Sequence, residues 1–199
     1  MTRLRLLTRK LARGERGFTL IEVLTTLLIL GVVMGGLSTV FASAINAEAD
    51  MNNRYRAQHS ARSALDKIRR EVHCASTASP AGSNTSSITL TLPTYCKTYS
   101  GNVSVTWCTR FVATNRYALY RVVGAFCGAS GGVKWADNLT PTSTATVCSG
   151  ALCVFNFTAQ TTASLAKLHL DLPVNVKPQK TRDTYELVDD LVLRNSTRS

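Results

Sequence analysis

Hydrophobic residues dominate one long stretch near the start of the chain. From Phe18 to Phe41 the sequence is almost entirely apolar, and Glu22 is its only ionisable residue. As an α-helix, this stretch would extend about 36 Å, which exceeds the ~30 Å hydrocarbon layer of a membrane. The pattern therefore predicts a membrane-spanning helix near the N-terminus.

An amphipathic helical pattern follows the apolar stretch. Between Ile45 and Cys74 there is no Gly or Pro, and small or apolar residues recur at spacings of three and four: Ala57, Ala61, Ala64, Leu65, Ile68 and Val72. This spacing predicts a helix that docks one face on a sheet. Continuous from Phe18, the helix would be over ~80 Å long. Three glycines (Gly31, Gly35 and Gly36) mark either points of bending or positions of close helix packing.

Short segments rich in β-branched and aromatic residues replace the helical pattern beyond Cys74. Residues 76–87 are rich in Ser, Thr, Ala, Gly and Pro and predict a loop. Strands are predicted at Ile88–Leu92, Val103–Phe111, Tyr117–Val123, Leu152–Phe157, Ala166–Val176 and Tyr185–Leu193. One long helix followed by six or seven antiparallel strands is an α+β arrangement, with the helix packed on the sheet.

One of these strands alternates strictly between apolar and polar residues. From Leu168 to Leu172 the leucines are separated by His169 and Asp171, so one face is expected in the core and the other in solvent. Pro173 follows directly, and it predicts an edge, a bend or a bulge because proline lacks an N–H.

Positive charge is concentrated before the apolar stretch. Residues 1–17 contain six basic side chains and one acidic one, Glu15, and without them the formal net charge falls from +11 to +6. Such a bias holds the N-terminal end of a membrane helix in the cytoplasm. Everything after the helix is then expected outside the cytoplasm.

Glu22 needs a physical explanation, since an acidic side chain inside a membrane costs about 2.5 kcal/mol or more and marks a partner or a function. A cut between Gly17 and Phe18 would create an α-amine at Phe18, one helical turn from Glu22. That amine would pair with Glu22 of the same chain or of a neighbouring subunit. The pairing predicts a role for Glu22 in assembly.

The segment Gly17-Phe18-Thr19-Leu20-Ile21-Glu22 resembles the prepilin signal of type IV pilins and type II secretion pseudopilins. The resemblance implies cleavage after Gly17 by a prepilin peptidase, N-methylation of Phe18, and packing of the apolar helices with those of other pilin subunits. It also implies that Glu22 supports subunit recruitment and register. The expected parts are a cleaved leader (1–17), a transmembrane assembly helix (18–42), an amphipathic helix (43–75) and an exported β-rich domain (76–199).

Two simpler interpretations compete with prepilin processing. A secretory signal would be cut after the A-x-A pattern at Ala42-Ser43-Ala44, but its apolar region would be longer than the usual ~7–15 residues and would contain Glu22. An uncut membrane anchor would leave Glu22 without a role. Prepilin processing is the interpretation that explains the charge.

All six cysteines lie beyond the predicted membrane helix, at Cys74, Cys96, Cys108, Cys127, Cys148 and Cys153. An even number outside the cytoplasm predicts disulfides. Cys148 and Cys153 flank a short turn and are the first expected pair. Cys96 with Cys108, across a hairpin turning near residues 100–102, is the second expectation, and elimination then pairs Cys74 with Cys127.

The charged residues and histidines beyond the apolar stretch do not favour a DNA-binding surface or a metal site. Basic residues between 54 and 70 alternate with acidic ones, among them Asp66 and Glu71, which predicts a solvated helix surface more than a DNA-binding one. His73 and the other histidines lack zinc-ligand spacing, so no metal or other cofactor is expected. A calcium site at Asp183, Glu186, Asp189 and Asp190 is the less favoured interpretation of that acidic stretch, because it lacks an EF-hand pattern.

An enzyme is not predicted. Residues Gly128–Gly132 match G-x-S-x-G formally, but a nucleophile elbow requires a strand before the serine and a helix after it. No helical period follows Gly132. The segment is therefore expected to be a Gly/Ser loop, and the chain is expected to be a substrate of the peptidase and methyltransferase.

The order of elements and the phrases Ala64–Glu71 and Leu191–Asn195 also resemble minor pilins and J-type pseudopilins, although six cysteines depart from the J-type pattern. The resemblance implies a structural subunit that initiates or caps a type IV pilus-like or type II secretion filament. Its expected partners are other pilin subunits and the cytoplasmic membrane, with the exported domain displayed on the filament. An adhesin or a DNA-capturing domain on the same anchor is the alternative.

Overall fold

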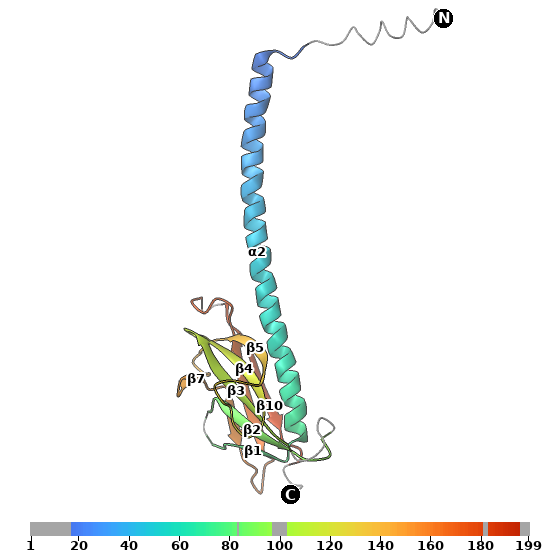
Figure 1. Cartoon of the computed structure of the whole chain (residues 1–199), viewed down its shortest axis with the longest axis vertical. Helices are drawn as coiled ribbons and strands as arrows, with labels where there is room; N and C mark the ends of the chain where they lie inside the picture. The colour runs from blue at the N-terminus through green and yellow to red at the C-terminus, as the bar shows by residue number, and fades with distance from the viewer. Residues whose placement is uncertain (1–16, 83, 97–102, 181–182, 196–199) are drawn as a thin grey trace, which may run out of the picture. The chain divides into compact units, whose positions relative to one another are not determined.

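The computed structural model describes residues 17–82, 84–96, 103–180 and 183–195. The predicted leader up to residue 16 and the predicted hairpin turn at residues 100–102 lie outside these ranges. The chain divides into two compact units, with the division between Asp50 and Met51. The predicted long helix is confirmed as α2 (Leu20–Cys74), which contributes to both units (Figure 1).

The second unit consists of the last part of α2 and ten strands (Figure 1). The strands are β1 (Thr77–Ser79), β2 (Ser87–Leu92), β3 (Val103–Ala113), β4 (Arg116–Val123), β5 (Val133–Leu139), β6 (Val147–Cys148), β7 (Ala151–Leu152), β8 (Phe155–Thr158), β9 (Lys167–Val174) and β10 (Tyr185–Val192). Eight of them form one sheet in the order β1-β2-β3-β4-β5-β9-β10, with β8 also paired to β9, and β6 pairs with β7. Every described pair is antiparallel, which confirms the predicted α+β class.

The sequence pattern missed three strands, β1, β5 and β6, and one predicted strand is divided in the structure. β1 occupies part of the predicted loop and pairs with β2 over only three residues. β5 was not predicted, because its sequence mixes Lys134, Asp137 and Asn138 with apolar residues and shows no clean alternation. The predicted strand at 152–157 is divided into β7 and β8, which pair with different partners.

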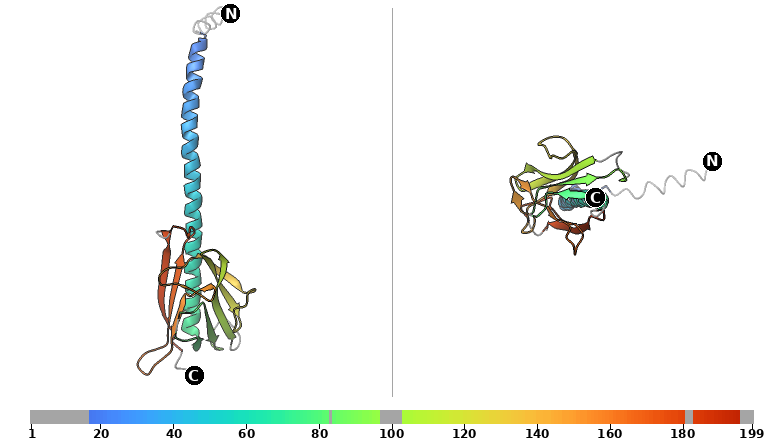
Figure 2. Two further views of the ribbon diagram at one scale, coloured as in Figure 1. Left: turned by 90° about the vertical axis from the view of Figure 1, so that its left-hand side faces the viewer. Right: turned by 90° about the horizontal axis from the view of Figure 1, so that it is seen from below.

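The core of the second unit forms where one stripe of α2 packs on the sheet. The predicted stripe residues are all buried, namely Ala57, Ala61, Ala64, Leu65, Ile68 and Val72. They face a sheet that curves around this part of the helix (Figure 2). The alanines let the sheet approach closely, and large buried side chains such as Trp107, Leu119 and Leu170 fill the remaining space. Each fully buried Leu contributes roughly 1.5–3 kcal/mol.

Glu71 lies inside this core and corrects the prediction of a solvated charge at that position. Only 2% of its surface is exposed. Its Oε1 accepts a hydrogen bond from Arg121 Nε at 2.9 Å, and its Oε2 accepts one from Trp107 Nε1 at 2.8 Å. Lys67 Nζ lies 3.4 Å from Oε1. The carboxylate therefore joins α2 to β3 and β4 as a satisfied buried ion cluster.

Strand β9 changes neighbours at its C-terminal end, and this explains Pro173. Along residues 167–170 it pairs with β8, whereas at Val174 it pairs with Leu139 of β5. Between these ladders Asp171 N donates to Val154 O, and Pro173 O accepts from Thr140 N at 3.0 Å. Proline is tolerated in this strand because the change of partners needs no N–H at that position.

The predicted alternation of β9 holds only in part. Leu168 and Leu170 are buried and His169 is exposed, but Asp171 is buried as well. Its Oδ2 accepts a hydrogen bond from Thr144 Oγ1 at 2.5 Å. The segment around Thr144 therefore covers this part of the outer face of β9, and strand alternation alone does not predict that cover.

All six cysteines form disulfides, but only one of the three predicted pairs is correct. Cys148 is bonded to Cys153, as expected from the short turn between them. The other bonds join Cys74 to Cys96 and Cys108 to Cys127, so the predicted pairs Cys96 with Cys108 and Cys74 with Cys127 are wrong. Strand β2 ends at Leu92, and Cys108 lies opposite Ser87 at its other end. Cys96 is thus beyond one end of the hairpin and Cys108 is at the other.

Candidate assembly segment

The first described residues flank the predicted cleavage site. Gly17, Phe18 and Thr19 precede the helix, which begins at Leu20. Thr19 caps it: its carbonyl accepts hydrogen bonds from the N–H groups of Glu22 at 3.0 Å and Val23 at 3.2 Å, and its Oγ1 lies 3.4 Å from Glu22 N. Sequence reasoning missed this cap, although a threonine three residues before a glutamate is the signature of a capping box.

Glu22 lies in the first turn of α2, where the N-terminus of the helix itself stabilises a negative charge. The unpaired N–H groups of a helix N-terminus carry a partial positive charge that stabilises an acidic side chain by about 0.3–1 kcal/mol at an exposed site. Glu22 is exposed in the single chain. It is therefore positioned to accept a partner from outside its own helix.

The polar residues of the apolar stretch are satisfied by the helix itself. Five hydroxyl groups, those of Thr25, Thr26, Ser38, Thr39 and Ser43, donate to backbone carbonyls three or four residues earlier, at 2.8–3.0 Å. A hydroxyl bonded in this way needs no water. The apparent polarity of these residues is thus compatible with hydrocarbon, a point that the sequence pattern did not reveal.

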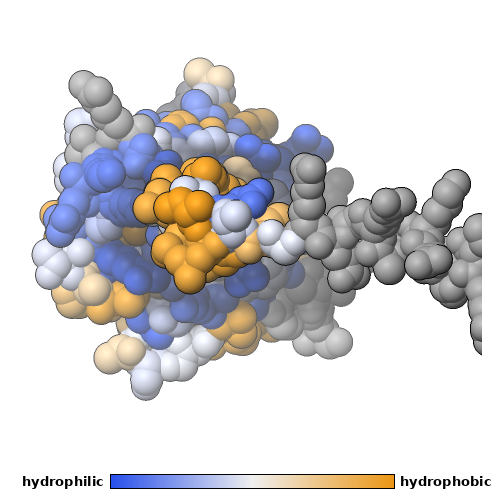
Figure 3. All heavy atoms as spheres, turned by 90° about the horizontal axis from the view of Figure 1, so that it is seen from above, coloured by the Kyte–Doolittle hydropathy of each residue, from blue (hydrophilic) through white to orange (hydrophobic). Residues whose placement is uncertain are grey.

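Hydrophobic side chains are exposed around this part of the helix. Residues 17–49 are all exposed, and Leu20, Leu28 and Val32 each expose about 70–80% of their surface. Figure 3 shows the near end of α2 as predominantly hydrophobic. Among the described residues, α2 is the one helix long and apolar enough to cross a membrane, as judged by length and composition.

The three glycines of this stretch have no structural requirement within the single chain. A Cβ atom added to Gly31, Gly35 or Gly36 would meet no atom within 4 Å, and none of them has a positive φ. The helix continues through all three. Gly31 and Gly35 are four residues apart and therefore share one face, the spacing that allows close approach of a second helix.

Some basic residues further along α2 attach the helix to the sheet, although Arg56, Arg62 and Arg70 are exposed, as predicted for a solvated surface. Arg54 Nη2 lies 2.8 Å from Asp183 Oδ2, and Arg69 Nη2 lies 2.7 Å from Asp189 Oδ2. Arg62 donates to Tyr185 Oη at 2.7 Å. These arginines attach the helix to β10 and to Asp183, which lies two residues before it. The charges of Arg54 and Arg69 are balanced by these aspartates, which makes them less available to a DNA backbone.

The acidic residues considered for calcium are separated by these contacts. Asp183 and Asp189 bind arginines of α2, while Asp190 pairs with Lys167 and His169 of β9, each at 2.8 Å. Hydrogen bonds from Lys167 and then His169 lower the pKa of Asp190. His73 lies in the last turn of α2, with Nδ1 3.0 Å from Val192 O. The described residues contain no group of three His, Cys, Asp or Glu side chains that could hold a metal ion.

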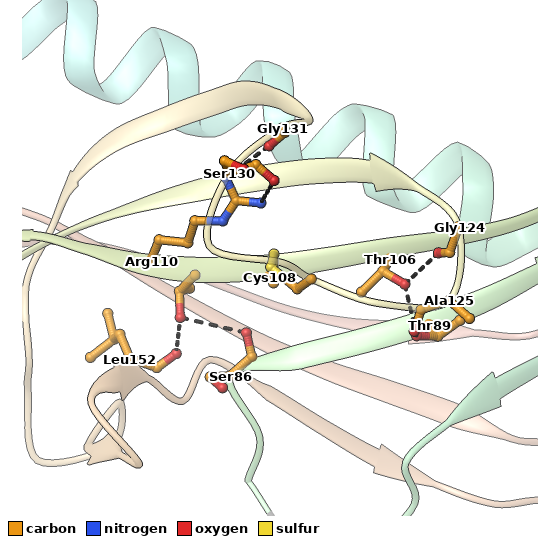
Figure 4. Close-up of a disulfide and its surroundings, with 12 residues drawn as sticks. Ser86, Thr89, Thr106, Cys108, Arg110, Gly124, Ala125, Ser130, Gly131 and Leu152 are labelled. Atoms are coloured by element: carbon orange, nitrogen blue, oxygen red, sulfur yellow. Dashed lines mark hydrogen bonds between the residues drawn. A yellow bond between two sulfur atoms is a disulfide. The ribbon is translucent and has the colours of Figure 1, made fainter.

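The G-x-S-x-G segment is a loop tied to the sheet, as predicted, and no helix follows Ser130. The connection from β4 to β5 is held by Arg110, which donates to the carbonyl oxygens of Gly131 at 2.8 Å and Ser130 at 3.5 Å (Figure 4). The Cys108–Cys127 disulfide fastens the same loop to β3. Strand β5 begins at Val133, so the geometry of a nucleophile elbow is absent from this segment.

Gly132, at the end of this loop, is the glycine with the clearest structural requirement. Its φ is 80°, and a Cβ atom there would lie 2.7 Å from Arg121 O and from Val122 Cγ2. Gly132 is thus explained by the loop's path along β4, and Gly131 by its positive φ of 83°.

Comparison with known proteins supports the assembly segment and is silent on the rest. The family model described as the prokaryotic N-terminal methylation motif matches residues 12–38, which include Gly17, Phe18 and Glu22. No curated protein and no solved structure matches the chain. This N-terminal motif supports a type IV pilin-like prepilin.

Proposed function

We propose that this protein is a minor pilin or pseudopilin, a structural subunit that initiates or caps a type IV pilus-like or type II secretion filament. Its leader is removed between Gly17 and Phe18, and the new N-terminus at Phe18 is methylated. The observation that supports this best is the exposed apolar surface of α2, on which Glu22 is the only ionisable residue from Phe18 to Phe41. The protein is a substrate of the processing enzymes and has no proposed reaction of its own.

In this proposal, α2 first anchors the precursor in the membrane and later packs in the filament. The internally bonded hydroxyls allow the helix to lie in hydrocarbon, and removal of the basic leader leaves Glu22 near a new terminal amine. A carboxylate in an apolar environment is stabilised strongly by a cation at short distance. The amine of a subunit's Phe18 and the Glu22 of its neighbour would therefore select the register of assembly.

The glycines of α2 support the packing step. Gly31 and Gly35 leave open space on one face of a helix that has no other reason to contain them. Small residues at this spacing let a second helix approach closely and gain dispersion contacts. We propose that this face contacts a neighbouring α2 in the membrane or in the filament.

We further propose that the second unit lies outside the cytoplasm. All six cysteines are bonded in this unit, and such bonds persist in oxidising compartments. The basic leader would hold the opposite end of the helix in the cytoplasm. DNA as a ligand is less well supported, because Arg54 and Arg69 of the helix are paired with aspartates.

The assembly role is tested by Glu22→Ala in cells that make the filament, with Glu48→Ala as the matched control. Both glutamates are exposed residues of α2, but Glu48 lies beyond the apolar stretch. We expect both variants to lose the leader normally and only Glu22→Ala to be missing from filaments isolated by shearing. Incorporation of Glu22→Ala at the level of the control would refute the assembly role.

A further inference from the structure

Strand β10 forms one edge of the large sheet. It pairs with β9 over eight residues without a bulge, from Tyr185 opposite Val174 to Val192 opposite Lys167. An edge strand of this length presents a row of backbone groups on its outer side. The register with β9 decides which residues carry these groups.

The contacts of β9 show which residues of β10 direct their backbone N–H and C=O groups to the outer edge. In an antiparallel strand, the N–H and C=O of one residue point to the same side. Asp171 N donates to Val154 O and Pro173 O accepts from Thr140 N, so both residues of β9 face away from β10. Their partners across the ladder, Val188 and Glu186, therefore direct their N–H and C=O groups to the outer edge.

One contact confirms this assignment independently. Val192 belongs to the same outward-facing set, since it lies opposite Lys167, an even number of residues from Asp171. Its carbonyl oxygen lies 3.0 Å from Nδ1 of His73, at the end of α2 rather than on β9. The outer edge is thus covered at Val192.

The edge is open further along. No strand in the described part of the chain pairs with β10 on this outer side, to which Glu186 and Val188 direct their backbone groups, and Asp190 N is bonded to the neighbouring Asp189 Oδ1 at 2.9 Å. The side chains of Glu186, Val188 and Asp190 are exposed, Val188 to 56%. No proline or bulge interrupts this stretch, two devices that commonly block strand addition.

The side chains along the edge restrict what can pair with it. A second copy added antiparallel about Val188 would place Glu186 opposite Asp190, and like charges directly opposite destabilise a sheet. A strand with basic residues at those two positions and an apolar residue between them would instead match the pattern. Asp190 already pairs with Lys167 and His169, so Glu186 offers the stronger charge contact.

We propose that the β10 edge binds an extended segment of a partner protein by strand addition. The segment would carry Lys or Arg opposite Glu186 and Asp190 and a β-branched residue opposite Val188. Its backbone would form hydrogen bonds with Val188 on both N–H and C=O, and its side chains would supply the specificity. This inference concerns the second unit alone and does not depend on cleavage or on the apolar helix.

The test uses the full chain in detergent micelles and two end-blocked peptides, TKTVTKT and TETVTET. Amide hydrogen exchange at Glu186 and Val188 is measured with about 1 mM peptide, a concentration suited to weak binding. We expect the basic peptide to slow exchange at both amides at least about tenfold and the acidic peptide to have no effect. No slowing with TKTVTKT, or equal slowing with both peptides, would overturn the proposal.

Two variants separate strand addition from non-specific charge attraction. Glu186→Lys should weaken binding of the basic peptide about fivefold and strengthen binding of the acidic one, because it reverses the charge of one cross-strand pair. Val188→Pro removes an N–H that points outward, so it should abolish peptide-induced protection at Glu186 while the inward-facing amide of Leu187 stays protected by β9. Undiminished peptide protection in Val188→Pro, with the β9 ladder intact, would show that binding does not use the edge.

Discussion

The two parts of α2 use hydrophobic residues in opposite ways. From Leu20 to Phe41 the helix is largely apolar on all sides and exposed, whereas from Met51 its buried residues form one narrow stripe rich in alanine. The stripe is complementary to the chain's own sheet, and the all-round surface has no partner among the described residues. A helix apolar on every side requires lipid or other helices around it. The exposed apolar residues are those we propose for assembly, and the buried stripe residues are those that stabilise the fold.

The sharpest test of this comparison sets Glu71 against Glu22. Glu71→Gln removes the charge at the centre of a buried cluster with Arg121 and Lys67, and we expect a loss of about 3–5 kcal/mol in the free energy of unfolding of the second unit. Glu22→Gln should leave that free energy unchanged. Chemical denaturation followed by tryptophan fluorescence measures both, since Trp107 contacts Glu71. Equal changes in the free energy of unfolding for the two substitutions would contradict the distinction between the two parts of α2.

Matched leucines provide the next test. Leu170 is fully buried in β9, and Leu28 exposes 69% of its surface. Leu170→Ala should destabilise the second unit by about 2–5 kcal/mol, because it removes transfer free energy and leaves a cavity. Leu28→Ala should change this stability by less than about 0.5 kcal/mol. The prediction fails if denaturation midpoints of the two variants coincide.

The disulfides distinguish positions within the second unit. Replacing Cys74 and Cys96 by serine removes a disulfide between residues 22 positions apart. Replacing Cys148 and Cys153 removes one between residues 5 positions apart. Loop-closure entropy predicts that the first pair stabilises by about 1.3 kcal/mol more than the second. Thermal unfolding of the two double variants checks the order. A larger loss for the Cys148 and Cys153 variant would contradict it.

The ion pairs that Asp190 of β10 forms with Lys167 and His169 of β9 should make the stability of the second unit slightly sensitive to acid. Lys167 and His169 lower the pKa of Asp190, so the ionised form is favoured in the folded state. This contribution is present above the unfolded pKa of about 3.9 and is lost as pH falls through the lower folded value. Asp190→Asn should therefore reduce stability slightly at pH 7 and not at all near pH 2. Identical pH profiles of wild type and variant would contradict this assignment.

Local patterns in the sequence predicted the parts of the fold that depend on neighbouring residues. The spacing of Ala57, Ala61 and Ile68 located the docking stripe correctly, and the Gly17–Glu22 segment pointed to the assembly motif. The Cys148–Cys153 bond was predicted because the two residues are close in sequence. Each of these inferences needed no knowledge of the tertiary structure.

Contacts between distant residues account for the errors. Glu71 lies among charged neighbours and looks solvated, but its partners Trp107 and Arg121 are 36 and 50 residues away. The pairing of Cys74 with Cys96 depends on where β2 ends relative to the helix, and composition does not specify that boundary. At the assembly segment, the cap at Thr19 could have been found from its spacing to Glu22.

We propose that α2 becomes an assembly helix when one peptide bond, between Gly17 and Phe18, is cleaved. Mass spectrometry of the protein isolated from its native membrane tests this directly. We expect a mature N-terminus at Phe18 that carries one methyl group on its amine. A chain that retains Met1, or one that begins at Ile45, would contradict it.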